Sequence, residues 1–161
     1  MLKLKLLITG ILFLLMTGCS FEKEIEMLTP EWIDSSGSEA EVRLQDLSAL
    51  IKVNRYATAV DTDDDLQLVL FELEIVNLSN NYFPCSSSFF TIGIGESDFT
   101  QAEYLPNNLL IEDLPVKEIY INESCQGVIA FWLPIDSDTS DIALEFNGYY
   151  REATKYRIDF N

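Results

Sequence analysis

The stretch of sequence that decides the fold is LQLVLFELEIVN, residues 66–77. Every second residue from Val69 to Ile75 is apolar, and these side chains share one face of an extended chain because neighbours along a strand point to opposite sides. The other face begins with leucines and ends with Glu72 and Glu74. Leucine and glutamate also suit a helix. The aspartates before the stretch and the turn sequence NLSNNY after it favour a strand with one fully buried face.

Short runs of β-forming residues recur on both sides of this stretch, separated by turn clusters. The runs fall at 42–44, 49–59, 88–95, 116–121, 127–133, 141–146 and 155–160. Only residues 109–114 are expected to form a short helical turn. Seven to eight short antiparallel strands predict an all-β domain over residues 41–161, an immunoglobulin-like β-sandwich.

The N-terminus has the pattern of an export signal. Lys3 and Lys5 precede an uncharged, mostly apolar run of eleven residues, 6–16. A bilayer-spanning helix needs about 20 residues, whereas a signal-peptide core needs fewer. We therefore expect residues 1–18 to be a cleaved signal peptide.

The signal ends in LMTGC, residues 15–19, which resembles the bacterial lipobox, although Met16 stands where leucine is usual. The resemblance implies cleavage before Cys19 and a diacylglyceryl thioether on its sulfur. Two acyl chains hold a protein stably to a membrane. The expected location is the bacterial cell membrane, facing the extracytoplasmic side as outer surface or periplasm. A plain signal peptide or an uncleaved anchor are the alternatives.

Residues 19–40 are polar, acidic and dotted with serine and glycine, which predicts a lipidated cysteine followed by a flexible tether. Trp32 lies within this stretch and outside the strand pattern. We expect it to pack the tether onto the sandwich; the alternative is an exposed anchor for a partner.

The chain is strongly acidic. Removing residues 1–18 leaves eight Lys and Arg against 27 Asp and Glu, a formal charge of −19 for the mature chain. Such a surface repels nucleic acid and anionic headgroups. We expect no nucleic-acid partner.

Three cysteines need assignment. If Cys19 carries lipid, Cys85 and Cys125 form an even pair in an oxidising compartment, where disulfides persist. Two free thiols or a metal site are the alternatives, and the absence of histidine from the sequence weakens the second. We predict a Cys85–Cys125 disulfide.

Five segments in order resemble a family of bacterial surface and lipoprotein domains of unknown function with an immunoglobulin-like, telokin-like sandwich. The segments are FELEIVNLS at 71–79, FFTI at 89–92, NES at 122–124, GVIAFWLP at 127–134 and IALEF at 142–146. The resemblance implies the fold and a place in the cell envelope. It implies no catalytic residue.

Residue chemistry points away from catalysis. The absence of histidine removes the commonest general base, and no phosphate-binding loop or nucleophile motif is present. Asp61, Asp63 and Asp65 have the spacing of the first calcium ligands in an EF-hand loop, with Glu72 at position twelve, but Leu66 occupies the position that requires glycine. A solvated acidic turn is the favoured interpretation, and a weak calcium site is the alternative. Asp136, Asp138 and Asp141 are interpreted as a second acidic turn.

Tyr149, Tyr150 and Arg151 open a short region rich in tyrosine and basic residues. Tyrosine and arginine are enriched at interface hot spots, so this region is a candidate partner-contact patch. The alternative is that these side chains serve the core and offset the acidic surface.

These observations favour a non-enzymatic, membrane-anchored envelope lipoprotein whose sandwich binds a protein or surface ligand. No cofactor is expected beyond weak calcium. The first alternative is a metal-dependent module or accessory enzyme that uses the turn at 61–65. The second is a structural or chaperone-like subunit of an envelope complex.

Overall fold

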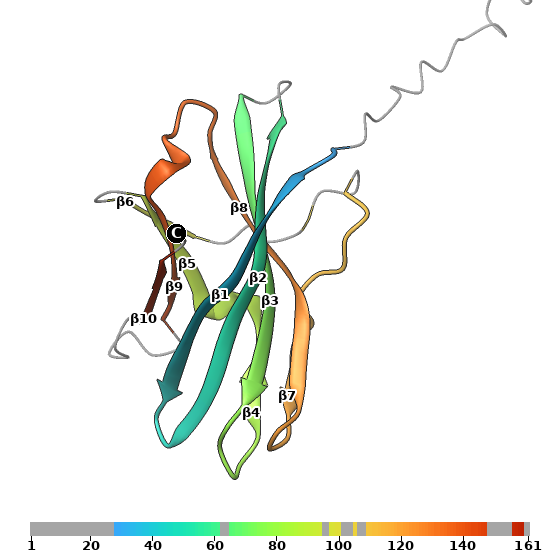
Figure 1. Ribbon diagram of the computed structural model, residues 1–161, viewed down its shortest axis with the longest axis vertical. Helices are drawn as coiled ribbons and strands as arrows, with labels where there is room; N and C mark the ends of the chain where they lie inside the picture. The colour runs from blue at the N-terminus through green and yellow to red at the C-terminus, as the bar shows by residue number, and fades with distance from the viewer. Residues whose placement is uncertain are drawn as a thin grey trace, which may run out of the picture.

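The computed structural model describes residues 28–61, 65–94, 97–100, 105, 109–147 and 156–159 (Figure 1). Ten strands lie in this part of the chain: β1 (Glu31–Leu44), β2 (Leu47–Asp61), β3 (Leu66–Asn77), β4 (Phe83–Cys85), β5 (Phe90–Ile94), β6 (Ser97–Thr100), β7 (Lys117–Ile119), β8 (Ser124–Pro134), β9 (Ile142–Phe146) and β10 (Tyr156–Asp159). Two 3₁₀ turns, Ser87–Phe89 and Thr139–Asp141, lie between strands. The described residues contain no helix long and apolar enough to span a bilayer.

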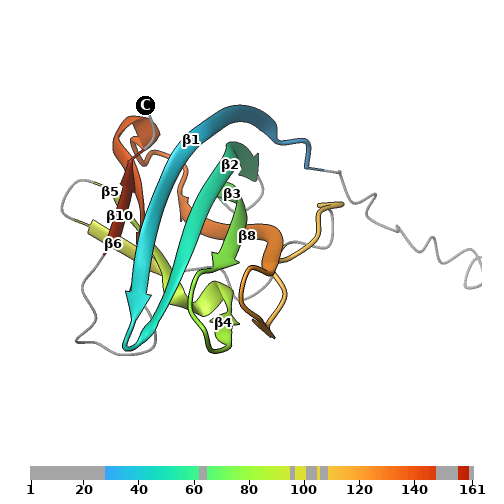
Figure 2. The same cartoon turned by 60° about the horizontal axis from the view of Figure 1, so that its bottom comes forward.

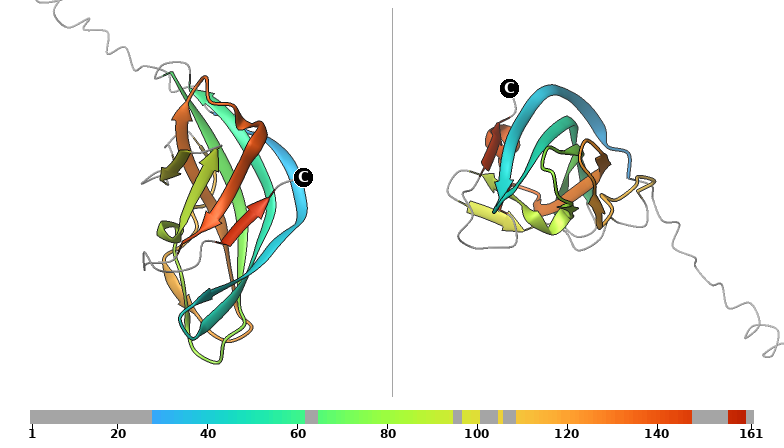
Figure 3. Two further views of the ribbon diagram at one scale, coloured as in Figure 1. Left: turned by 90° about the vertical axis from the view of Figure 1, so that its left-hand side faces the viewer. Right: turned by 90° about the horizontal axis from the view of Figure 1, so that it is seen from below.

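The strands form two layers (Figures 2 and 3). One four-stranded sheet has the order β1-β2-β3-β8, and a second has the order β10-β9-β5-β6. The strand pairs are antiparallel, and a two-stranded ribbon of β4 and β7 extends from one end. The main core joins Phe71 and Phe131 of the first sheet to Ile92, Leu144 and Phe146 of the second. The all-β sandwich is therefore confirmed, with β4 and β6 as strands that the sequence pattern did not reveal.

Strand β3 is central because it pairs with β2 on one side and β8 on the other. Its outer face starts apolar and ends with Glu72 and Glu74, which pair with Arg55 and Lys52 of β2. The Glu74 carboxylate lies 3.3 Å from the Lys52 ammonium. Burial raises the pKa of Glu74, but the hydrogen bond and charge of Lys52, together with hydrogen bonds from Ser124 and Gln126, leave the pKa below its ordinary value. The two glutamates on the outer face of β3 are thus paired with basic side chains of the neighbouring strand.

The sandwich begins earlier than the sequence predicted. Residues 31–40 were assigned to the tether, but β1 starts at Glu31 and pairs with β2 along its length. A register shift between Asp34 and Ser38 accommodates the polar SSGS sequence, and the Ser35 hydroxyl donates to the Val53 carbonyl at 3.2 Å. Edge strands of natural sheets carry charged and polar residues that discourage pairing with other chains, so the composition of residues 31–40 resembles that of a tether.

Trp32 packs onto the outer face of the first sheet, as expected of a residue that fastens the N-terminal segment. Its ring lies 4.4 Å from the Arg55 guanidinium carbon, a cation–π contact. The side chain also contacts a second buried apolar cluster on this face. That cluster is formed by Ala57, Ala59, Leu68, Leu70, Leu109, Val128 and Ala130.

Residues 109–114 do not form the predicted helical turn. They run as an extended strap along the free edge of β8, where Leu114 N donates to Val128 O and Val128 N donates to Glu112 O, both at 2.9 Å. Gly127 is required beside this strap, because an added Cβ would lie 2.4 Å from Leu114 Cα. Backbone groups of Glu112 and Leu114 bond to Val128 of β8 in place of helical hydrogen bonds within the segment.

Candidate functional site at the tip of the sandwich

The proposed calcium residues lie at the hairpin between β2 and β3. Asp61 ends β2 and pairs with Leu66, and Asp65 is a turn residue with a left-handed φ of 54°. Glu72 lies six residues into β3 beyond Leu66, roughly 20 Å along the strand at 3.3 Å per residue, and it pairs with Arg55. A twelve-residue calcium loop closed by Glu72 is therefore not formed. Asp63 lies outside the described residues, and weak calcium binding at the turn itself stays a prediction.

Acidic and cysteine side chains elsewhere in the described residues form no metal centre. A search of the described ranges finds no group of three His, Cys, Asp or Glu side chains that would suit a metal ion. In the second acidic turn, Asp138 caps the 3₁₀ segment by accepting from Ser140 N at 2.9 Å. Hydrogen bonds from Ser140 lower the pKa of Asp138. This agrees with a turn role for these aspartates.

Besides Asp63, four predicted functional residues lie outside the described residues: Cys19, Tyr149, Tyr150 and Arg151. Lipidation of Cys19 and the tyrosine–arginine contact patch therefore stay predictions.

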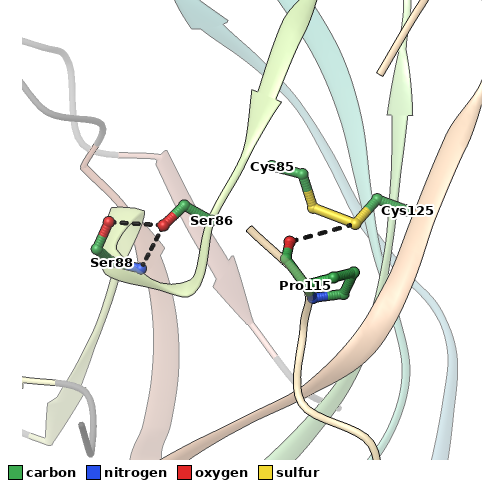
Figure 4. The surroundings of a disulfide bond; sticks show 5 residues. All are labelled: Cys85, Ser86, Ser88, Pro115 and Cys125. Atoms are coloured by element: carbon green, nitrogen blue, oxygen red, sulfur yellow. Dashed lines mark hydrogen bonds between the residues drawn. A yellow bond between two sulfur atoms is a disulfide. The ribbon is translucent and has the colours of Figure 1, made fainter. Parts of the chain in front are cut away.

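The predicted cysteine pair is joined. Cys85 at the end of β4 and Cys125 near the start of β8 form a disulfide, with their Cα atoms 6.7 Å apart (Figure 4). Both are buried, and the Pro115 carbonyl oxygen lies 3.8 Å from Cys125 Sγ. The bond closes a loop of sequence separation 40 and fastens the β4–β7 ribbon to the first sheet.

Next to the disulfide, two loops meet at one end of the sandwich. We call this end the tip; it comprises residues 78–82, after β3, and residues 120–123, after β7. The buried side chain of Asn77 joins the loops, because its amide nitrogen donates to Asn81 O at 2.7 Å and to Ile119 O at 2.9 Å. Its amide oxygen accepts from the backbone and hydroxyl of Ser79, at 2.8 and 2.6 Å. All four bonds are internal, so both loops have a defined conformation.

The backbone of Asn77 and the turn at 120–123 complete the link. Asn77 N donates to Glu123 O at 3.1 Å, and Asn122 N donates to Asn77 O at 2.9 Å. Two hydrogen bonds close the turn: Glu123 N donates to Tyr120 O at 3.0 Å, and Tyr120 N donates to the Glu123 carboxylate at 2.9 Å. Asn122 has a φ of 61°, a left-handed conformation that asparagine tolerates better than most residues. The turn is therefore built by its own sequence.

Large apolar side chains are exposed on this rigid frame. The tip patch consists of Leu78, Tyr82, Tyr120 and Ile121, which are between 43 and 55% exposed. The two tyrosine rings meet edge to face, with centroids 4.5 Å apart. Single exposed apolar residues are ordinary, whereas a group of them at one end of the domain is a candidate interaction surface.

The tip is acidic as well as aromatic. Glu118 and Glu123 are exposed, and both act on the Tyr120 phenol. A hydrogen bond with Tyr82, the charge of Tyr82 and these two carboxylates raise the pKa of Tyr120. The patch therefore combines two tyrosine rings with two neighbouring carboxyl groups.

The tip lies at the opposite end of the first sheet from the start of β1 (Figure 1). Glu31 at the start of β1 pairs with Thr58 of β2. Val42, near the end of β1, pairs with Ala49, which in turn pairs with Asn77 at the end of β3. Eleven residues separate these two positions of β1, roughly 35 Å of strand. The tip is thus held away from the point where the chain enters the sandwich.

Sequence reasoning identified the parts of the tip without its assembly. The sequence predicts a turn after residue 77, and it places NES at 122–124 only among the segments of the family resemblance. Their meeting depends on pairing between distant strands. The sequence feature that could have indicated the tip is a tyrosine close to each asparagine-containing turn, Tyr82 after Asn81 and Tyr120 before Asn122.

Two solved structures have a similar fold. A candidate lipoprotein of Bacillus subtilis subsp. subtilis str. 168, ycdA, superposes with a TM-score of 0.57 at 16% identity, covering 76% of this chain and 38% of its own length. A functionally unknown protein of Listeria monocytogenes EGD-e gives a TM-score of 0.52 at 11% identity, covering 83% of this chain and 89% of its own. At these identities the likeness shows the fold alone.

No family model matches the sequence, and the comparison with curated proteins gives no match. Membership of the telokin-like family therefore stays a prediction.

Proposed function

We propose that this chain is a non-enzymatic, membrane-anchored envelope lipoprotein whose sandwich presents the tip to a protein partner. The observation that carries the proposal is the tip patch, a group of exposed apolar side chains on two loops held by Asn77 and the disulfide. Rigid aromatic side chains give large contact area at low entropic cost, which suits protein recognition.

The anchor is proposed from the lipobox-like sequence that ends at Cys19. A shared fold with a candidate lipoprotein of Bacillus subtilis supports it, as does a buried disulfide, which suits an exported protein. The domain would face the outside of a one-membrane cell or the periplasm of a two-membrane cell. Because the tip lies opposite the start of β1, a lipid at Cys19 leaves it accessible to partners.

The anchor is tested with Cys19→Ser in the full chain. We expect the native protein to sediment with membranes and to incorporate labelled palmitate, and the variant to lose both properties. A membrane-bound, palmitate-labelled variant would contradict the lipid anchor at this residue.

The contact surface is tested by photo-crosslinking in intact cells. A photoreactive amino acid replaces Tyr120 in one variant and the exposed Glu39 of β1 in a matched control. We expect a discrete cross-linked species from position 120 and none from position 39. Equal labelling from both positions would contradict a partner at the tip. A stoichiometric complex recovered from position 120 favours a subunit role over transient binding.

A further inference from the structure

The β4–β7 ribbon sorts its side chains by face. Phe83 pairs with Ile119, and both are buried. Pro84 pairs with Glu118 one residue further along each strand, so these two point to the other face because strand side chains alternate. The same alternation places Tyr82 and Tyr120 on the face of Glu118, where their rings meet. The outward face of the ribbon thus carries two phenol rings beside a carboxylate.

The turn adds a second carboxylate to this face. Glu123 is tied to Tyr120 by the hydrogen bonds that close the turn, and its side chain is exposed. The nearest basic residue on the ribbon, Lys117, pairs with Cys85 and falls on the face of Ile119 by alternation. Half-exposed aromatic rings next to two carboxylates form an environment that attracts a cation through its charge and through the ring faces.

Charge complementarity selects the occupant. We infer that the tip binds a protein segment that presents a lysine or arginine beside an apolar residue, with the cation between the tyrosines and Glu118 and Glu123, and the apolar side chain on Leu78 and Ile121. This inference rests on the proposed function and names the chemistry of its partner. An anionic lipid surface is disfavoured by the same carboxylates and by the net negative charge of the chain. A second copy of the tip would bring like charges together.

The test uses the mature full-length protein in detergent micelles and three labelled, end-blocked hexapeptides. The first is Gly-Leu-Lys-Leu-Lys-Gly; the second has glutamate for lysine, and the third has serine for leucine. We expect the first to bind at least tenfold more tightly than the second and measurably more tightly than the third. Equal affinity for the first and second peptides overturns the inference.

Variants place the binding at the tip. Tyr82→Ala with Tyr120→Ala, and Glu118→Gln with Glu123→Gln, should each weaken binding of the first peptide at least fivefold. Tyr82→Phe with Tyr120→Phe keeps both rings and should retain most of the affinity, which guards against a loss due to misfolding. The control pair Glu31→Gln with Asp136→Asn removes the same charge at the opposite end of the first sheet from the tip. Equal loss in the control pair would show general attraction to an acidic protein and overturn the inference.

Two further measurements distinguish a cationic protein segment from a lipid surface or a second copy of the chain, and distinguish this inference from the proposed function. Tip-dependent binding to vesicles of phosphatidylglycerol, or tip-dependent dimerisation, would overturn the cationic-segment inference in favour of lipid or of a second copy. If photo-crosslinking from position 120 captures a partner whose contact segment lacks lysine and arginine, the inference fails while the proposed function stands. If the first peptide binds at the tip but position 120 captures nothing in cells, the proposed function fails by itself.

Discussion

The side-chain amide of Asn77 donates a hydrogen bond to the backbone carbonyl of Ile119, 2.9 Å away and 42 positions along the sequence. Asn77 ends the central strand, and Ile119 ends the short strand that leads to the second loop of the tip. One fully buried amide therefore sets how the two loops stand relative to each other. The shape of the tip patch depends on this contact.

Asn77→Ala should destabilise the domain by about 3 kcal/mol, because it leaves the buried backbone N–H of Ser79 and the buried carbonyl of Ile119 without the Asn77 side chain. Urea unfolding measures the loss. The control is Asn80→Ala, an exposed position in the same loop where the change should stay within about 0.5 kcal/mol. Similar effects at both positions would contradict a hub role for Asn77.

Replacing Cys85 and Cys125 with alanine should cost roughly 2–4 kcal/mol, because the disulfide closes a loop of sequence separation 40 and restricts the unfolded chain. The measurement is the urea midpoint of the double variant against the oxidised native protein. The reduced native protein should behave like the variant. A loss below about 1 kcal/mol would mean that packing alone holds the ribbon.

Gly127→Ala should destabilise the domain by about 1–3 kcal/mol, since the new methyl group meets the backbone of Leu114 and the strap must move. Thermal melting checks the loss. Val116→Ala serves as the control, because that side chain is 81% exposed next to the same strap. An unchanged melting temperature in the glycine variant would place the strap elsewhere.

Tyr82→Phe should lower the pKa of Tyr120 towards the ordinary tyrosine value, because the hydrogen bond with Tyr82 is the largest cause of the raised pKa. A raised folded-state pKa contributes stability below the unfolded pKa, and that contribution is lost as pH rises through the folded value. The measurement is the tyrosine ring-carbon NMR shift of Tyr120 in alkaline titration. Tyr56→Phe, in the first sheet, is the control and should leave this titration unchanged.

Lys52→Met should raise the pKa of Glu74, since burial then acts without the opposing hydrogen bond and charge of lysine. In the native protein the lowered pKa contributes stability above the unfolded pKa of glutamate, and this is lost as pH falls through the folded value. A carboxyl-resolved NMR titration in the acid range measures the change. An unaltered Glu74 titration in the variant would mean that the ion pair does not persist in solution.

The β3 pattern shows what periodicity can predict. Alternation over residues 66–77 identified the strand with the bounds that the structure has, and the half-apolar second face agrees with its central position. The same method missed β1 between residues 31 and 40, because an edge strand is polar and resembles a linker in composition. It missed β4, which has only three residues and gives no period. Strand position in the sheet, rather than residue type, accounts for these differences.

The cysteine pair was predictable by counting, whereas the tip was not. Lipidation expected at Cys19 leaves two cysteines, and the structure joins them. The partners of Asn77 come from residues 79, 81 and 119, and no local pattern marks the last of these. Composition places a predicted contact patch at Tyr149, Tyr150 and Arg151, which lie outside the described residues. Within the described residues, Tyr82 and Tyr120 are exposed and their rings meet, which composition did not predict.

Local chemistry determined much about this protein from the sequence alone: its acidity, its expected export and anchor, its cysteine parity and the alternation that specifies a β-sandwich. Those properties depend on residue type and on neighbours within a few positions. Only the tertiary structure shows that Gly127 leaves space for the backbone of the strap and that Trp32 lies over Arg55. It also shows that two separate turns form one tip. Each of these depends on contacts between separate segments of the chain, which the pairing of β1 with β2, of β3 with β8 and of the strap with β8 brings within reach.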